Sequence, residues 1–222
     1  MFAATLPGSG PVQVRLHRPP PLGVPLAVER SGASVRIQDD GELVAEVART
    51  TELQLQTPET PTLAEAAAAA AGSAFRRRTV AHPFPTCFGC GTLRPPGDGL
   101  QIWPGLTNSG RVAAAVWDPR PWLGADGTLA SELQWAALDC PGALGAMEQL
   151  GLTLGDETWL LGTMSAEVSP CWPAAEPVVV LGWLQSHQGR KHLVGSALVT
   201  PEGTVMARAE AIWIQVDSAA DR

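Results

Sequence analysis

A single carboxylate within a small, apolar segment is the first candidate for chemistry. Residues 129–146, LASELQWAALDCPGALGA, predict a helix with Asp139 near its middle. Its neighbours on the same helical face include Glu132 and Trp135. An ionised carboxylate on such a face is costly unless it is paired, hydrogen-bonded or lining a cleft. We therefore expect Asp139 to face a cleft beside the start of this helix.

A carboxylate in such a cleft can attack a carbonyl carbon or activate a water molecule. Backbone N–H groups near Ala130 and Ser131, at the positive end of the helix, could polarise the carbonyl oxygen. Glu132 is a second carboxylate, but it lies about 10 Å along the axis from Asp139, too far to share a proton. In the alternative interpretation, Asp139 only caps or hydrogen-bonds a strand in a protein without catalysis.

The segment HPFPTCFGC contains a second group of reactive side chains, His82, Cys87 and Cys90. A C-x-x-C turn with a nearby histidine can bind zinc, but a structural site needs four ligands and the chain has no second C-x-x-C. Candidate fourth ligands are Cys140, Cys171 and Asp98. We expect a tight turn with buried thiols and no metal, and we expect no organic cofactor.

Composition limits the class of protein. The 222 residues are 45% hydrophobic and 17% charged, enough to fill a core, and no apolar run approaches the ~20 residues of a membrane span. The formal net charge of −7 argues against a nucleic-acid partner. The start, MFAATLPGSGPV, lacks the basic and apolar regions of a signal peptide. We expect a cytoplasmic protein without a membrane partner, whose cysteines are thiols or metal ligands.

Charge and aromatic residues divide the chain into two parts. Residues 1–100 carry nine Arg and nine Asp or Glu, whereas the excess of acid and all eight tryptophans lie after residue 100. Between the parts, the alanines of TLAEAAAAAAGSAFRRR favour a linker helix within residues 61–81. The expected units are therefore 1–60, the linker 61–81, and 82–222.

An internal repeat relates these two parts. Residues 12–28 match residues 164–180 in their spacing of strand, proline-rich corner and strand, and residues 39–48 match 201–210. Each copy predicts three consecutive antiparallel strands. Only the second copy is preceded by a strand (residues 100–117, broken at a proline) and a long helix. Because the first copy lacks a helix, we expect exposed apolar surface and a homodimer.

This order of elements, and two motifs, resemble the hotdog proteins of the phenylacetate-pathway thioesterase type. CFGCGTLRPPGDGLQI, residues 87–102, resembles the C-F-x-C-G…G-L start of their first strand. Their helix carries HGGxxxxLxD, and Asp139 takes the place of its carboxylate. Ala130, Ser131 and Glu132 stand where that family has His-Gly-Gly. The resemblance implies an α+β hotdog fold, an antiparallel sheet wrapped around a long central helix, with a partial N-terminal repeat.

The same resemblance implies a hydrolase of acyl-CoA or a related acyl thioester. Asp139 and Glu132 are then the catalytic candidates, and the positions expected to bind substrate are Ala130, Ser131, Trp135, Arg190 and Lys191. Of these, the last two would meet the phosphates of coenzyme A. The alternative is a non-catalytic hotdog module that binds acyl-CoA or a lipid-like ligand, or serves as a scaffold.

Overall fold

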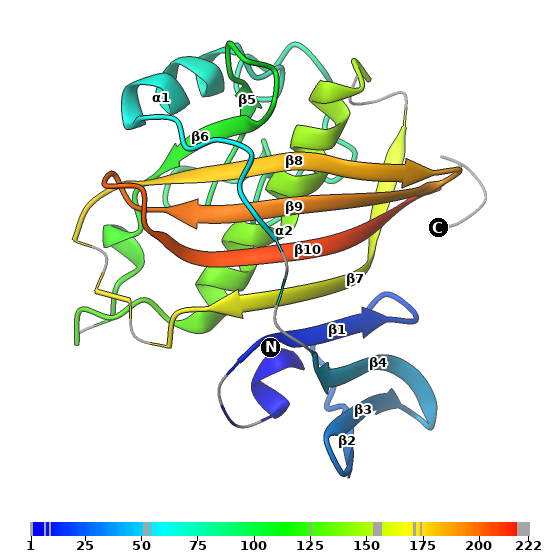
Figure 1. Ribbon diagram of the computed structural model, residues 1–222. Coiled ribbons are helices and arrows are strands. Elements are labelled where there is room, and N and C mark those ends of the chain that lie inside the picture. The colour runs from blue at the N-terminus through cyan, green and yellow to red at the C-terminus, as the bar shows by residue number, and fades with distance from the viewer. Residues whose placement is uncertain are drawn as a thin grey trace.

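One antiparallel sheet runs through the part of the chain that this computed structural model describes, residues 2–6, 8, 10–50, 53, 55–124, 126–152, 157–170, 172–173 and 175–216 (Figure 1). Its first four strands are β1 Val12–Leu16, β2 Ala27–Ser31, β3 Ser34–Asp39 and β4 Glu42–Arg49. The others are β5 Gly105–Leu106, β6 Ala113–Trp117, β7 Thr158–Val168, β8 Val178–Gln188, β9 Lys191–Val199 and β10 Val205–Val216. The expected broken strand before the long helix is therefore a short hairpin, β5 and β6.

The strand order places β1 and β7 at the centre of a symmetric arrangement. The order is β2-β3-β4-β1-β7-β10-β9-β8-β6-β5, so β4, β3 and β2 follow β1 outward as β10, β9 and β8 follow β7. β1 and β7 pair antiparallel, with Val12 opposite Ala166 and Arg15 opposite Thr163. The N-terminal strands thus continue the sheet of the C-terminal part (Figure 1).

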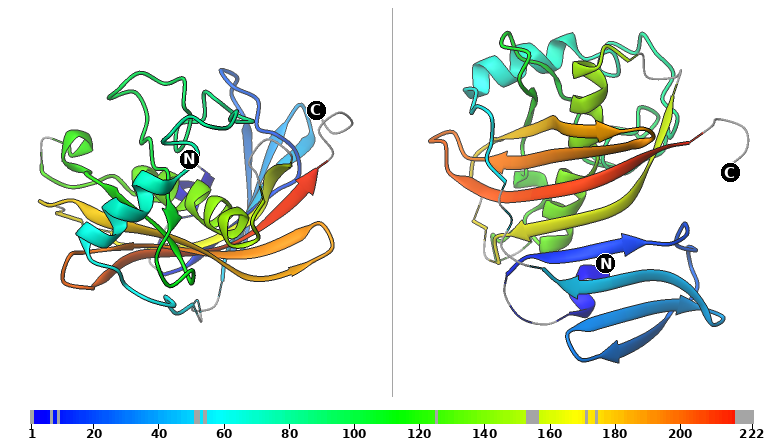
Figure 2. Two further views of the ribbon diagram at one scale, coloured as in Figure 1. Left: turned by 90° about the horizontal axis from the view of Figure 1, so that it is seen from above. Right: turned by 45° about the vertical axis from the view of Figure 1, so that its right-hand side comes forward.

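The long helix α2, Ser131–Gln149, lies along one face of the sheet, which curves around it (Figure 2). It begins two residues later and ends three residues later than the predicted 129–146, and Pro141 lies inside it without ending it. Small residues permit the close approach, because a Cβ on Gly182 of β8 would collide with the carbonyl group of Pro141. A side chain on Gly145 of α2 would collide with Gly182 in turn. The small-residue composition therefore reflects helix-to-sheet packing.

The alanine-rich linker forms α1, Leu63–Gly72, on the opposite face of the sheet from α2. Thr62 and Glu65 form a capping box that fixes its start. Side chains alternate along a strand, and in β8 Val180 joins the core around α2 whereas Val179 and Leu181 pack with α1. This helix therefore buries an apolar face.

A short 3₁₀ segment and packed side chains complete the N-terminal part, and a second 3₁₀ segment lies between β6 and α2. The segments are η1 Phe2–Thr5, which packs on β1 and β4, and η2 Arg120–Trp122. In this part Val35, Ile37 and Val47 are at most 1% exposed, whereas Leu22, Val24 and Val28 are 93%, 47% and 41% exposed. The expected homodimer stays a prediction. Within the described residues, no helix is long and apolar enough to cross a membrane.

Candidate active site

Asp139 lies where two cavities meet. The larger cavity, about 480 Å³, lies between the N-terminal strands and the first half of α2, and the smaller, about 250 Å³, lies beside the cysteine turn. Asp139 and Leu161 line both. The cavity walls come from segments far apart in sequence, so the sheet is what brings them together.

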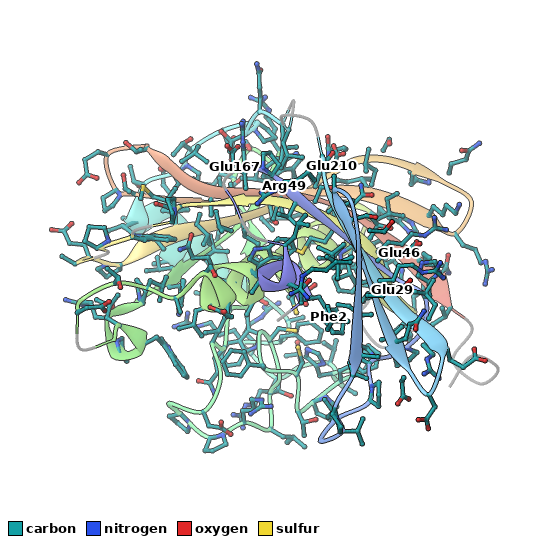
Figure 3. The ribbon with its side chains drawn as sticks, turned by 90° about the horizontal axis from the view of Figure 1, so that it is seen from below. Phe2, Glu29, Glu46, Arg49, Glu167 and Glu210 are labelled. Carbon is teal, nitrogen blue, oxygen red and sulfur yellow. The ribbon has the colours of Figure 1, made fainter. Side chains whose placement is uncertain are left out.

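The larger cavity is lined mainly by apolar side chains. η1 supplies Phe2, β1 supplies Val14 and Leu16, and α2 and β7 supply the opposite walls. Figure 3 shows Phe2 on its short helical turn, between the N-terminal strands and the green helix α2. An apolar hollow of this size that ends at a carboxylate suits an apolar ligand with one polar group.

One oxygen of the Asp139 carboxyl group is buried, although the side chain is partly exposed. Its Oδ1 is buried and has no hydrogen-bond partner among the described residues, while the side chain is half-buried. Burial, and after it the nearby Cys87 thiolate, raise the pKa of Asp139 to about 7. A carboxyl group in this state can accept a proton near neutral pH, as a general base must.

Three thiols and one imidazole form the wall of the smaller cavity. The Sγ atoms of Cys87, Cys90 and Cys140 all lie within 4.8 Å of one another, and Cys87 and Cys140 are 3.6 Å apart. His82 Nε2 lies 3.2 Å from the sulfur of Cys90. Hydrogen bonds from the thiols of Cys140 and Cys90 hold the pKa of Cys87 well below its ordinary value. The pKa of Cys140 is raised well above its ordinary value, and the hydrogen bond to Cys87 is the largest cause.

The start of α2 contains the other residues expected at the site. Trp135 is buried and lines the larger cavity, and Glu132 is exposed and lines it too. The Ser131 hydroxyl donates to Glu132 at 3.3 Å, and Ala130 precedes the helix without a side-chain cap. The first turn lies about 10 Å along the axis from Asp139. The polarisation of a carbonyl by its N–H groups stays a prediction.

Arg190 and Lys191 lie away from these cavities. They occupy the β8–β9 turn and the start of β9, and neither is among the residues that line either cavity. The Arg190 carbonyl accepts a hydrogen bond from the backbone of Gln215 at 2.8 Å, so the turn packs along β10. The structure does not bring this pair to Asp139.

Two buried polar side chains around α2 were missed by sequence reasoning. Gln134, fully buried, donates to the carbonyl of Ser169 at 2.9 Å and accepts from its N–H at 3.1 Å. The Ser196 hydroxyl of β9 donates to the carbonyl of Leu138 at 2.7 Å, next to Asp139. A buried Gln on an apolar face was the available signal for the first, whereas Ser196 had none.

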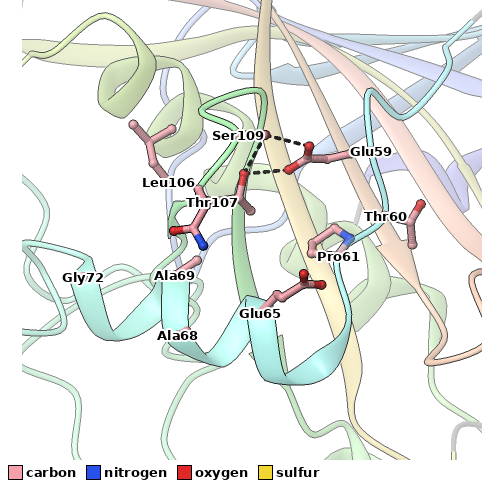
Figure 4. A pocket seen from close by; sticks show the side chains of 11 residues that line it. Glu59, Thr60, Pro61, Glu65, Ala68, Ala69, Gly72, Leu106, Thr107 and Ser109 are labelled. Atoms are coloured by element: carbon pink, nitrogen blue, oxygen red, sulfur yellow. Dashed lines mark hydrogen bonds between the residues drawn. The ribbon is translucent and has the colours of Figure 1, made fainter.

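A third hollow, beside α1, also contains carboxylates, but they are used structurally. Both Glu59 oxygens accept hydrogen bonds at 2.6 Å, one from Thr107 and one from Ser109 (Figure 4). Glu65 accepts from the backbone and hydroxyl of Thr62 at 2.8 Å. Satisfied carboxylates of this kind fasten a loop and cap a helix, in contrast to Asp139.

Comparison with known proteins relates the fold to thioesterases. No protein-family model matches the sequence, and no curated protein does. A tesB protein of Mycobacterium avium subsp. paratuberculosis superposes with a TM-score of 0.55 at 13% identity, covering 93% of this chain and 78% of that one. The acyl-CoA thioesterase II TesB2 of Mycobacterium marinum gives 0.51 at 14% identity, with 93% and 79% covered. At these identities the likeness shows the fold alone, the α+β hotdog fold.

Proposed function

We propose that this protein hydrolyses an acyl-CoA or a related acyl thioester, with Asp139 as general base or nucleophile. The observation that carries the proposal is the buried, unpartnered Oδ1 of Asp139 at the junction of two cavities. Burying this oxygen costs free energy, and no described residue forms a hydrogen bond with it that would offset the cost. A carboxylate that is buried at a cost in free energy is expected to have a catalytic role.

The acyl chain fits the larger cavity, where the walls are apolar. Leu133 and Trp135 of α2 face it, as do Phe2 and Val14 from the N-terminal part. The thioester carbonyl would then lie at Asp139, where the carboxylate attacks it or takes a proton from a water that attacks. In the general-base route the water oxygen bonds to the carbonyl carbon, the C–S bond breaks, and the thiolate takes the proton from the carboxyl group of Asp139. In the nucleophilic route the C–S bond breaks to leave an acyl anhydride on Asp139, the thiolate takes a proton from solvent, and a water molecule then hydrolyses the anhydride to release the acid.

We further propose that β1–β4 are the remnant of a second hotdog unit, residues 1–60, joined through 61–81 to the complete unit 82–222. The symmetric strand order around β1 and β7 supports this, as does the matched spacing of the two sequence segments. The missing central helix leaves room on this side of α2, which η1 only partly fills. The remnant would thus supply the outer wall of the acyl cavity.

Turnover and binding measured on the same acyl-CoA panel test the proposed function. The panel spans short, medium and long saturated chains and one arylacyl-CoA, with thiol release followed by absorbance and binding followed by calorimetry with a non-hydrolysable thioether analogue. Catalytic thiol release supports the hydrolase. Binding of the analogue without turnover of any panel member would show the non-catalytic module, and absence of both would reject an acyl-CoA site.

A further inference from the structure

The thiol cluster has the composition and spacing of a metal site. Ligands bound at about 2.3 Å to a tetrahedral zinc ion lie about 3.8 Å from one another. The Cys87 and Cys140 sulfurs are 3.6 Å apart, and the Cys90 sulfur is 3.2 Å from His82 Nε2. The three sulfurs lie within 4.8 Å of one another. We propose that Cys87, Cys90 and Cys140 bind one zinc ion, and that His82, which lies outside this group of three, moves to complete a Cys₃His site.

The turn that carries two of the thiols is held in shape by its own backbone. The N–H of Gly91 donates to the Cys87 carbonyl at 2.8 Å, and the N–H of Cys87 donates to the Phe84 carbonyl at 2.9 Å. A Cβ on Gly91 would lie 2.5 Å from the Cys87 carbonyl oxygen, so only glycine fits there. Both sulfurs of the turn are therefore presented to one side.

The third thiol comes from the central helix, and glycine again permits the approach. A Cβ on Gly89 would lie 3.1 Å from the sulfur of Cys140 and 3.4 Å from the Ala136 carbonyl oxygen. Cys90 and Cys140 are only 4% and 7% exposed. Burial protects a zinc–thiolate centre from exchange, and thiolate ligands favour zinc over harder divalent cations.

Of the three sulfurs, the imidazole of His82 contacts only that of Cys90, so it must move toward the other two sulfurs and change its tautomer to bind zinc. Its ring stacks on Phe75 at 4.4 Å, and its Nδ1 accepts a hydrogen bond from the Phe84 N–H at 2.9 Å. That contact requires the proton on Nε2, whereas zinc binding through Nε2 requires it on Nδ1. The Phe84 amide must therefore give up this hydrogen bond. His82 should be the weakest of the four ligands.

A zinc ion here would fasten the 82–91 turn to the middle of α2, immediately beside Asp139. Binding displaces the remaining thiol protons, so that a divalent cation takes their place in the cluster. The site would then be part of the smaller cavity's wall without taking part in hydrolysis. This inference stands independently of the proposed function, because metal content is measured without substrate.

The test uses the full chain, purified in reductant without an affinity tag, and measures metals by inductively coupled plasma mass spectrometry. We expect about one zinc per chain. Cys87→Ser, Cys90→Ser and Cys140→Ser should each lower bound zinc at least about tenfold, and His82→Ala should weaken affinity by a smaller factor. Cys171→Ser is the control, since Cys171 lies outside the described residues and is not one of the proposed ligands, and it should keep the metal.

A spectroscopic measurement on the wild-type chain tests the site even if the cysteine variants fail to fold. After chelation under reductant, Co²⁺ should give the intense visible bands of a tetrahedral thiolate site, and Zn²⁺ should abolish them. The proposal is overturned if the reduced wild type binds neither ion, or if Cys140→Ser keeps its full zinc. It is also overturned if mass spectrometry finds any of the three thiols in a disulfide in freshly purified protein, or if Cys171→Ser loses the metal.

Discussion

The sulfur atoms of Cys87 and Cys140 lie 3.6 Å apart although 53 residues separate them in the sequence. Cys140 directly follows Asp139 on α2, so the third thiol and the carboxylate are adjacent on one stretch of helix. The proposed metal site and the proposed reacting group are therefore neighbours, and both line the smaller cavity. A substitution at the proposed metal site should therefore also be assayed for hydrolysis, and a substitution of Asp139 should also be assayed for bound metal.

Val14→Trp tests whether the N-terminal strands form the wall of the acyl cavity. Val14 of β1 lines the larger cavity, and a tryptophan there would fill part of its 480 Å³. We predict that kcat/KM for long-chain acyl-CoAs falls about tenfold relative to short-chain ones, as expected for a lost apolar subsite of 1–2 kcal/mol. Arg15→Trp, exposed and on the other face of the same strand, is the control. Equal losses for all chain lengths, or equal effects of both variants, would argue against this placement.

Gly182→Ala tests the close packing of α2 on β8. The added Cβ would collide with the Pro141 carbonyl group, which belongs to the backbone and cannot rotate away. We predict a loss of at least about 2 kcal/mol in the free energy of unfolding, measured by urea denaturation. In the control Gly72→Ala, the new Cβ meets no atom within 4 Å, so stability should stay level or rise slightly. Wild-type stability of Gly182→Ala would show that the two backbones lie further apart.

His192→Gln tests a buried histidine on β9. Burial, and then the nearby His187, lower the pKa of His192 below its ordinary 6.5, while Glu157 and the Arg190 carbonyl oppose this shift. Because the unfolded chain binds the proton more readily, the neutral ring contributes stability above pH 6.5 that is lost as the pH falls through the lowered folded pKa. The variant should show a shallower decline in unfolding free energy between about pH 7 and pH 5. Identical pH profiles for wild type and variant would refute this.

Sequence patterns predicted the local elements of the fold because those patterns are themselves local. The small residues around Asp139 indicated the helix, and residues 12–28 and 164–180 indicated strands that the structure contains. The contact of Phe2 with the cavity beside Asp139 depends on how β1 joins β7, which no single segment specifies. The hairpin of β5 and β6 was expected as one strand broken at a proline, whereas the chain reverses after it, in the turn that begins at Thr107.

The candidate site shows the same division between chemistry and geometry. The cost of burying a carboxylate singled out Asp139 without any knowledge of its surroundings. The third thiol, Cys140, could be named only as one of several ligand candidates, because its approach to Cys87 needs the helix, the turn and Gly89 together. Arg190 and Lys191 were chosen for their charge; the β8–β9 hairpin places them beside β10, and their contact with the phosphates of coenzyme A stays a prediction.

Asp139→Asn tests the central claim most directly, through kcat on the best acyl-CoA of the panel. The amide keeps the shape of the side chain but removes the base and the nucleophile, so kcat should fall about 100-fold or more with little change in unfolding free energy. Glu132→Gln, which changes the exposed carboxylate of the same cavity, is the matched control and should stay within a few-fold of wild type. An Asp139→Asn protein that is folded and hydrolyses acyl-CoA at the wild-type rate would contradict the account.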